Sequence, residues 1–469
     1  MMSKILTVLL LACFFAIASC MPNGPKSHNQ YVLTGLNIVD TETGSIHMDQ
    51  SIVIKNEEIA EIFEDGTQTP AADTVINMDE KYVIPGLWDM HIHLRGGTKL
   101  ASSNKKLLPL FPAHGVTTVR DAGGDLTSSV IEWKQQIEKD TMTGPFIFTS
   151  GPKLDGPNGT WEGSLEVENK ADVSIALDSL QSLNADYVKI YDSQLSAQAY
   201  MEIVRQAEQR GLKTTGHMPM TVLINDALEA GLDGIEHLYY VMKGASTKEA
   251  EIALAVQHGD IGFWTAVQQL LNSYDEAKAK AFYQKLKAHK VAVVPTLYID
   301  DVLSYLHEEN HSEDDFLKYI PQDIQQTYNR RLNSAQQRDQ QAITFEERLN
   351  QHFKKITKDL HDAGVTILAG SDAGAYNSFV YPGQSLHKEL QALQAAGLSS
   401  LEALQTATIH ASKFFSGHNR PGNITKGKAA DLLILNQNPL DDISNTTRIH
   451  AVIKNGRFLN ESELKGILE

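Results

Sequence analysis

The chain has 469 residues, of which 42% are hydrophobic and 21% are charged, a composition typical of a globular protein that can bury a large core. Its formal net charge of −17 at pH 7 argues against a nucleic-acid-binding function, because binding to phosphates requires a basic surface. Downstream of the N-terminal segment, no run of about 18 apolar residues predicts a membrane-spanning helix.

Residues 1–20 have the composition of a secretory signal peptide. Lys4 supplies a positive charge, an apolar run follows over residues 5–18, and small residues precede the end of the segment. The segment ends in Ile17-Ala18-Ser19-Cys20, which resembles a bacterial lipobox. The only other cysteine, Cys13, lies inside the signal, so the exported chain has no disulfide to form. We therefore expect lipidation at Cys20; the alternative is a plain signal peptide cleaved near Ser19.

A lipid on Cys20 would make the exported chain a membrane-anchored lipoprotein, which requires more than one acyl chain for stable attachment. Met21 stands where an aspartate would indicate retention at the inner membrane of some bacteria. We therefore expect the protein on the periplasmic face of the outer membrane. Residues 21–30 are polar and are predicted to be a tether.

Short β-rich segments flank the chain on both sides of its central part. Residues 31–83 contain four of them and residues 416–469 contain two, separated by Gly, Asn and Asp. Since chain termini often lie close together, we expect the two flanks to pair into one small β-sandwich domain. The predicted strands span residues 31–33, 37–39, 51–54, 59–63, 430–435 and 451–457.

The central part, residues 84–415, alternates strands and helices. Its eight predicted strands span residues 82–93, 116–122, 146–150, 187–191, 213–217, 234–238, 291–297 and 366–371. This number and order predict an α/β fold with a (β/α)8 TIM barrel, and a doubly wound open sheet is the alternative. Residues 261–266 form a ninth strand candidate. Residues 300–350 are polar, rich in Gln and helical, and are predicted to be an insertion that serves as a lid.

Six polar residues fall in or at the ends of these strands, where barrel active sites are built. A single histidine at a strand end is more often structural, a lone lysine can reach the surface, and Gly-Ser-Asp-Ala-Gly can be only a turn. All six together favour a shared metal site, because imidazole and carboxylate groups are metal ligands. The six are His91, His93, Lys189, His217, His237 and Asp372.

Several motifs resemble those of the amidohydrolase superfamily, in its imidazolonepropionase and prolidase-like branch, and the resemblance covers residues 31–460. These motifs are Pro85-Gly86-Leu87-Trp88-Asp89-Met90-His91-Ile92-His93-Leu94, Gly115-Val116-Thr117-Thr118-Val119-Arg120-Asp121, Gly216-His217-Met218-Pro219, Gly370-Ser371-Asp372-Ala373-Gly374 and Gly427-Lys428-Ala429-Ala430-Asp431-Leu432.

The resemblance implies a site with two divalent metals. One would be held by His91, His93 and Asp372, the other by His217 and His237, and a carbamylated Lys189 would bridge them. Zn²⁺ suits these ligands best, with Mn²⁺ or Co²⁺ as alternatives. A metal-activated bridging hydroxide would attack the substrate, with Asp372 as general base.

Substrate-binding residues are harder to assign from the sequence. Candidates near the strand ends are Tyr191, Tyr239, Tyr240, Arg120 and Trp161, each of which could equally be a packing residue. His387 and Glu389, on a helix after the last predicted strand, could support the site or be exposed. The loop at 155–161 and the segment at 217–219 depart from the dipeptidase pattern of the branch, so its dipeptide-binding residues do not transfer.

These features predict a metal-dependent hydrolase of amide-type C–N bonds whose substrate is a small molecule, such as a dipeptide or an N-acyl amino acid. A lactone, cyclic amide or phosphotriester is an alternative on the same metal centre, because the fold does not select the bond. A non-catalytic binding lipoprotein is the alternative of another class, and it is disfavoured because all six site residues are present. A deaminase is disfavoured by the bridging lysine. A homo-oligomer is compatible with these predictions.

Overall fold

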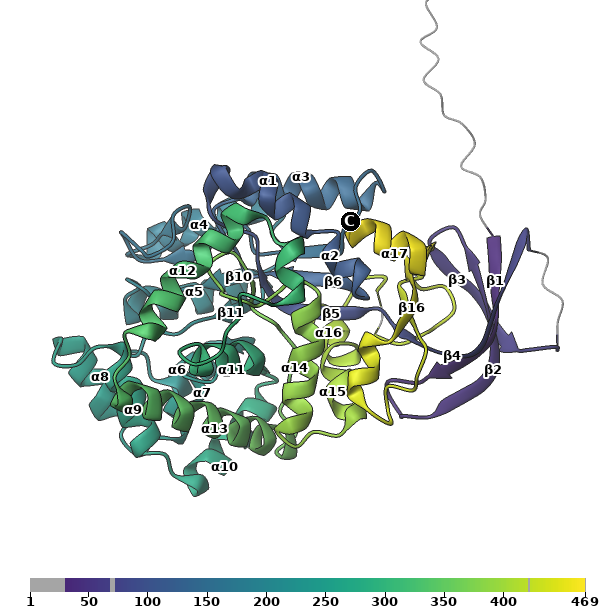
Figure 1. Ribbon diagram of the computed structural model, residues 1–469. Helices are drawn as coiled ribbons and strands as arrows, with labels where there is room; N and C mark the ends of the chain where they lie inside the picture. Colours follow the sequence, from purple (N-terminus) through teal and green to yellow (C-terminus); the bar gives the residue numbers. More distant parts are fainter. Residues whose placement is uncertain (1–29, 68–71, 421, 469) are drawn as a thin grey trace, which may run out of the picture.

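The computed structural model describes residues 30–67, 72–420 and 422–468. The predicted signal peptide, Cys20 and nearly all of the predicted tether therefore lie outside the described residues. The described chain is an α/β protein with two parallel sheets and one mixed sheet, and the mixed sheet lies at one end of the molecule (Figure 1). None of the helices in these ranges is long and apolar enough to cross a membrane.

The mixed sheet has seven strands in the order β17-β16-β15-β4-β1-β2-β3, so the N-terminal and C-terminal flanks pair in it. β1 pairs with β4 in parallel and with β2 antiparallel, and β15 pairs antiparallel with β4. The strands are β1 (Gln30–Val39), β2 (Ile46–Lys55), β3 (Glu58–Glu64), β4 (Thr74–Pro85), β15 (Leu432–Leu435), β16 (Ile449–Lys454) and β17 (Arg457–Asn460).

The two faces of this sheet bury different cores, because successive side chains of a strand point to opposite faces. Leu33, Ile52 and Ile434 belong to a cluster internal to the sheet, whereas Leu433 and Val452 join the core of the central part. The expected β-sandwich is corrected to one sheet. That sheet curls, so that the β3 edge reaches the segment before β15 through an Ile59 N–H bond to the Lys428 carbonyl at 2.9 Å.

The central part contains two parallel sheets, with strand orders β14-β5-β6-β7 and β13-β12-β11-β10-β8-β9. Most of these strand residues are buried, as expected for parallel strands covered on both faces. The strands are β5 (Leu87–His93), β6 (Val116–Asp121), β7 (Phe146–Thr149), β8 (Leu154–Asp155), β9 (Leu165–Glu166), β10 (Val188–Ile190), β11 (Thr214–Gly216), β12 (Gly234–Glu236), β13 (Ala292–Val294) and β14 (Ala373–Gly374).

A closed ring of strands is not detected within the described ranges. The last predicted strand, residues 366–371, forms only an isolated bridge between Val293 and Ile367, and β14 follows it. Backbone bonds still connect this segment to both sheets, since Met90 N–H donates to the Ala369 carbonyl at 2.8 Å and Leu368 N–H to the Val293 carbonyl at 3.0 Å. The structure therefore confirms an α/β fold with parallel sheets.

Helices surround the two parallel sheets (Figure 1). They are α1 (Gly97–Leu107), α2 (Leu110–Ala113), α3 (Thr127–Glu138), α4 (Lys170–Ser182), α5 (Ala197–Gln209), α6 (Ile224–Glu229), α7 (Val241–Ala245), α8 (Glu249–His258), α9 (Phe263–Asn272), α10 (Glu276–Ala288), α11 (Leu297–Tyr305), α12 (Gln322–Gln336), α13 (Gln340–Asp362), α14 (Gln384–Ala395), α15 (Ser400–Thr406), α16 (Ile409–Phe414) and α17 (Glu461–Leu468), with the 3-10 helices η1 (Asp315–Tyr319) and η2 (Ile443–Thr447).

The ninth strand candidate, residues 261–266, is wrong. Helix α9 begins at Phe263 and buries Ala266, Val267, Leu270 and Leu271. That spacing is the three-to-four residue period of a helix, and the apolar start of the segment concealed it. The helical character of residues 300–350 is confirmed by α11, η1, α12 and much of α13.

Candidate metal centre

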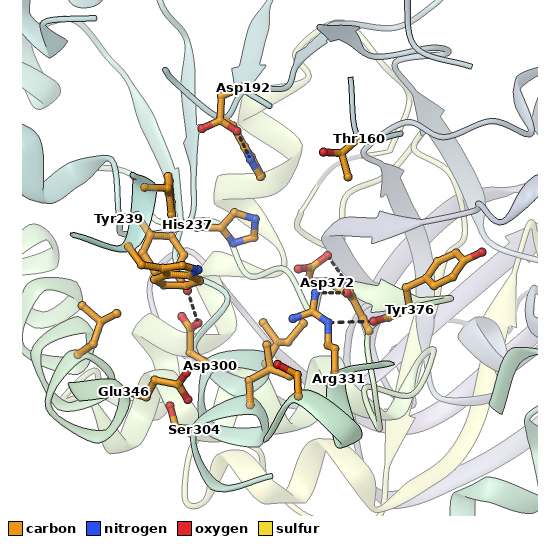
Figure 2. Close-up of a pocket in the computed structure, with 18 of the residues that line it drawn as sticks. Thr160, Asp192, His237, Tyr239, Asp300, Ser304, Arg331, Glu346, Asp372 and Tyr376 are labelled. Atoms are coloured by element: carbon orange, nitrogen blue, oxygen red, sulfur yellow. Dashed lines mark hydrogen bonds and ion pairs between the residues drawn. The ribbon is translucent and has the colours of Figure 1, made fainter. Parts of the chain in front are cut away.

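The polar ends of the parallel strands open into a cavity of about 770 Å³, which helices α11, α12 and α13 wall on one side (Figure 2). Of the residues predicted from the sequence, those that line it include His93, His217, His237 and Asp372. The predicted substrate residues Trp161, Tyr191, Tyr239 and Tyr240 line it too. The cavity thus combines candidate metal ligands with an aromatic wall.

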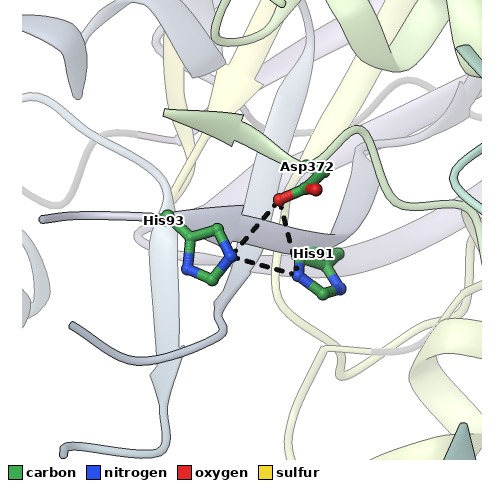
Figure 3. A group of neighbouring side chains, drawn as sticks. All are labelled: His91, His93 and Asp372. Carbon is green, nitrogen blue, oxygen red and sulfur yellow. Dashed lines mark hydrogen bonds and ion pairs between the residues drawn. The ribbon is translucent and has the colours of Figure 1, made fainter. Parts of the chain in front are cut away.

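Three candidate ligands meet at the end of β5 (Figure 3). His91 and His93 are two residues apart on this strand, so both imidazoles point to the same side. Their Nε2 atoms are 3.3 Å apart, and Asp372 Oδ1 lies 3.3 Å from His93 Nε2 and 3.6 Å from His91 Nε2. One potential ligand atom from each residue lies within 4.8 Å of the others, a spacing that suits one metal ion.

Asp372 reaches this position through a strained turn. Its φ of 57° is in the left-handed region, which a non-glycine residue rarely adopts. Its N–H donates to the His91 carbonyl at 2.7 Å. Beside it, the buried carboxylate of Asp89 accepts from the Ser371 N–H at 2.9 Å and from the Ser371 hydroxyl at 2.5 Å. The turn is therefore bonded directly to β5, the strand that carries the two histidines.

His217 and His237 follow β11 and β12 and approach the first three residues. The His237 ring lies 5.1 Å from those of His91 and His217. His237 also has a left-handed φ, of 64°. Neither residue belongs to the group of three around Asp372, so the structure brings His217 and His237 beside that group and not into it.

All four imidazoles are held in the same way, with Nδ1 against a protein group. The partners are a Glu236 oxygen for His91 at 2.5 Å, the Gly123 carbonyl for His93 at 3.1 Å, an Asp192 oxygen for His217 at 3.1 Å and the Thr296 hydroxyl for His237 at 2.8 Å. Carbonyl and carboxylate oxygens accept only, so Nδ1 carries the proton there and Nε2 keeps a free lone pair. Such support orients imidazoles for metal binding.

Burial keeps the imidazoles neutral, as ligands must be. It lowers the pKa of His91 and His93 well below the ordinary range and that of His237 to about 3. Burial alone would raise the pKa of Asp372, but neighbouring positive charges hold it below its usual value, among them the guanidinium groups of Arg95 and Arg331, which stay charged when the imidazoles are neutral. The site therefore offers neutral imidazoles and an ionised carboxylate, a donor set that suits a divalent cation.

Lys189 lies in the middle of β10 and is buried. Within the described part of the chain, its Nζ finds no hydrogen-bond partner. Burial lowers the pKa of this amine to about 8, and its charge acts on all four histidines. A buried amine without a hydrogen-bond partner is unfavourable, and so are the Nε2 lone pairs of His91 and His93 at a separation of 3.3 Å. A ligand bound at these atoms would relieve both. The residues therefore fit a divalent metal centre.

Arg120 does not reach the cavity that its predicted role in substrate binding requires. It is buried behind β5, where its Nε donates to the Met90 carbonyl at 2.6 Å and its Nη2 to Glu236 Oε1 at 2.7 Å. The same carboxylate holds His91. Arg120 therefore supports the metal ligands from behind, because it lies in a strand whose residues are all buried.

His387 and Glu389 are buried rather than exposed. His387 Nδ1 lies 2.9 Å from the Thr446 hydroxyl, and its Nε2 lies 2.8 Å from the His114 carbonyl. Glu389 accepts from the N–H groups of Leu297 and Tyr298 at 3.1 and 2.7 Å, so it caps the start of α11. Both residues are structural, and Glu389 fixes a helix that walls the cavity.

The sequence interpretation missed several polar residues of the site. Glu236 precedes His237 in an apolar strand, and that buried charge was the available signal. Asn377 donates to Asp372 Oδ1 at 2.7 Å, and Arg95 and Arg331 donate to the Asn377 Oδ1 at 3.0 and 2.8 Å. Lys153 is buried 4.7 Å from the Trp161 ring centroid. Nothing in the local sequence marks the last four residues.

A model of the amidohydrolase family matches residues 82–459 of the chain. Among known proteins, ochratoxinase of Aspergillus niger is 24% identical over 387 residues, which cover 77% of this chain and 71% of that enzyme.

Solved structures share the fold. A Xaa-Pro dipeptidase with bound methionine aligns with a TM-score of 0.67 at 19% identity, over 92% of this chain and 100% of the other. A bottromycin amidohydrolase aligns with a TM-score of 0.71 at 21% identity, over 94% and 89%.

Proposed function

Because this chain belongs to the amidohydrolase family and is an enzyme acting on carbon–nitrogen bonds, we propose that it hydrolyses the amide bond of a dipeptide or an N-acyl amino acid. The observation that carries the proposal is the meeting of His91, His93 and Asp372 beside a cavity that His217 and His237 also line. The buried Lys189 acts electrostatically on all four histidines, and its Nζ has no hydrogen-bond partner among the described residues. Imidazole and carboxylate donors of this kind bind the divalent ions that catalyse hydrolysis.

The proposed cofactors are two divalent ions; Zn²⁺ suits the ligands best, and Mn²⁺ or Co²⁺ are the alternatives. His91, His93 and Asp372 would hold one ion, and His217 and His237 would hold the other. When bound, such ions lower the pKa of water and polarise the carbonyl that is attacked. Support for this assignment comes from the four Nδ1 bonds, which leave the Nε2 lone pairs of the four imidazoles available to a metal ion.

Lys189 is the proposed bridging ligand, in its carbamylated form. The neutral amine forms an N–C bond with carbon dioxide and releases one proton, so that a carbamate with two oxygen donors replaces a cation. Burial lowers the pKa of the Lys189 amine to about 8, which raises the fraction of the neutral form that this addition needs. The absence of a hydrogen-bond partner for Nζ, among the residues the structure describes, supports the assignment.

Asp372 is the proposed general base. Its carboxylate takes the proton of the attacking water and passes it to the leaving nitrogen. Its lowered pKa keeps the carboxylate ionised at neutral pH, so that it can accept this proton. Asn377 donates to Asp372 Oδ1, which leaves Oδ2 for the water. Trp161, Tyr191 and Tyr239 would shape the substrate cavity.

The dipeptide assignment draws on a similar protein, the Xaa-Pro dipeptidase. A lactone, cyclic amide or phosphotriester remains the second candidate, because the same metal centre serves those bonds. We further propose that the two parallel sheets form one (β/α)8 barrel, which is consistent with the bonds of segment 366–369 to both sheets. Export as an outer-membrane lipoprotein through Cys20 also remains a proposal.

The deciding experiment combines metal analysis of the purified chain 21–469 with a substrate screen. Expression with zinc and bicarbonate should yield close to two metal ions per chain and turnover of dipeptides or N-acyl amino acids. Chelation should abolish that turnover, and added Zn²⁺ should restore it. Turnover confined to lactones or phosphotriesters would replace the amide assignment with the second candidate, and a chain without metal would contradict the proposal.

A further inference from the structure

One end of the cavity contains buried polar atoms that no protein group satisfies. Within the described ranges, Asp300 Oδ2 and both side-chain polar atoms of Asn350 make no hydrogen bond. Asp300 lies on α11 and Asn350 on α13, and both residues line the cavity. Asn350 is only 2% exposed. Since buried polar groups in folded proteins are nearly always bonded, this set indicates a ligand that supplies the partners.

Asp300 is the acidic group of this region that lacks a counter-ion. Its other oxygen, Oδ1, accepts from the Tyr239 hydroxyl at 3.3 Å, a neutral partner (Figure 2). The neighbouring acid of the wall, Glu346, is already paired with Arg338 at 2.6 Å. Burial raises the pKa of Asp300 well above its usual value, and the charge of Glu389 adds to that effect. A cation bound beside Asp300 would reverse this shift.

Aromatic rings complete the same end of the cavity. The Tyr239 ring lies 5.1 Å from Phe353, 5.8 Å from Trp264 and 5.9 Å from Phe263. All four side chains line the cavity, and Trp264 remains 57% exposed. Aromatic faces attract cations through the ring quadrupole, so a carboxylate within an aromatic wall suits an ammonium or guanidinium group better than a neutral one.

We propose that Asp300, Asn350 and Tyr239 form a subsite for a positively charged side chain of the substrate, a primary ammonium or a guanidinium. Asp300 Oδ2 and Asn350 Oδ1 accept its N–H groups, and the rings cover its alkyl stem. The inference rests on the proposed function, because the subsite shares its cavity with His237 and Asp372. An acidic side chain would gain no such pairing from Asp300, so we expect it to be a poorer substrate group than a basic one.

The test uses matched dipeptides and N-acyl amino acids that carry lysine, norleucine or glutamate at one position, on either side of the scissile bond. For one of the two positions of the variable residue, kcat/KM for the lysine substrate should exceed kcat/KM for the norleucine substrate. Asp300→Asn should lower this lysine-to-norleucine ratio of kcat/KM by at least about 30-fold. The matched control is Asp301→Asn, which removes the same charge one residue away. Asp301 pairs with Lys354 at 2.6 Å and does not line the cavity, so the ratio should not change.

Two further measurements keep the test decisive. Asn350→Leu should also lower the ratio, and metal content verifies that each variant is folded. Butylammonium, compared with butanol, should raise the melting temperature of the metal-loaded wild type but not of Asp300→Asn. If butylammonium binds in this way but no amide is cleaved, the proposed function fails and the subsite stands. If amides are cleaved with equal ratios in wild type and Asp300→Asn, or with a preference for norleucine or glutamate, the subsite is overturned.

Discussion

At the scale of single residues, the candidate ligands differ in how visible they are in the sequence. His91, His93 and Asp372 stand in compact motifs at strand ends, so their convergence could be predicted. Glu236 carries only the weak signal of a charge in a buried strand, because its partner His91 is distant in the sequence. Asn377 could not be predicted, because its contact with Asp372 depends on how the turn between them folds. For Arg120 the error is the opposite one: its place near a strand end suggested substrate binding, but its side chain points into the core and pairs with Glu236.

Lys189→Met should remove the metal bridge. We expect metal content to fall below two ions per chain and kcat/KM to fall by more than about 100-fold, because loss of a supporting partner alone typically costs 10–100-fold. Lys243→Met is the matched control, since Lys243 is also buried but donates to the Pro219 and Met220 carbonyls at 3.1 and 2.9 Å. Elemental analysis of both variants decides the matter, and full metal content in Lys189→Met would refute the bridging role.

Glu236→Gln should weaken metal binding without removing a ligand. Its carboxylate accepts from His91, Arg120 and the Thr215 hydroxyl, the last at 2.6 Å, and an amide cannot accept from all three. We expect a loss of about 10–100-fold in metal affinity, measured by competition with a chelator. Glu249→Gln, which alters a buried glutamate bonded to the Ile224 N–H, should leave that affinity unchanged.

At the scale of elements, helix α12 is tied to the turn that carries Asp372. Arg331 Nε donates to the Tyr376 carbonyl at 2.9 Å and Nη2 to Asn377 Oδ1 at 2.8 Å, and Asn377 in turn donates to Asp372. Arg331→Lys cannot make both bonds. We expect kcat to fall by up to about 100-fold through misplacement of Asp372. Arg348→Lys, on α13 and outside the cavity lining, is the control; equal kcat values in the two variants would contradict the link.

Helix α15 offers a test of local stability and its pH dependence. Ser399 and Glu402 form a capping box, in which the Ser399 N–H bond and His361 hold the pKa of Glu402 at about 2. Since this pKa is depressed, the stabilisation is complete above about pH 4.5 and is lost as the pH falls towards 2. Ser399→Ala should cost about 1 kcal/mol. The stability deficit of Glu402→Gln should narrow below pH 4.5, and a deficit that stays constant during acid titration would contradict this.

The elements themselves were predictable where the apolar period was long and unambiguous. Strands β6 and β10 lie where buried runs predicted them. The predicted strand at 366–371 failed because its backbone bonds to both neighbouring sheets without forming a regular ladder. The segment at 261–266 failed because an apolar start is shared by buried strands and helices.

At the scale of the whole molecule, the curled sheet and the central part share one core. Val39, Ile84 and Leu433 of the sheet pack in the same cluster as Val119 and Ile235 of the parallel strands. The domain boundaries at 83/84 and 415/416 remain sequence predictions, because a shared core marks no border between the sheet and the central part.

This shared core predicts that the sheet and the central part unfold together. Differential scanning calorimetry of the metal-loaded protein should show one transition, with a calorimetric enthalpy equal to the van't Hoff enthalpy. Two resolved transitions would contradict it. Leu433→Ala, which removes a side chain buried in the shared core, should lower the temperature of that single transition, at a cost of about 2–5 kcal/mol.

The position of the curled sheet also determines by which end of the molecule the enzyme is held when it is attached through its N-terminal segment. The described chain starts at Gln30 in β1, and the sheet lies at one end of the molecule, whereas α8 and α9 lie at the other (Figure 1). The cavity is walled by α9 and α13. Attachment through residues upstream of β1, whether to a lipid surface, a chromatography bead or a fusion partner, would therefore hold the enzyme at the sheet end of the molecule, away from α9.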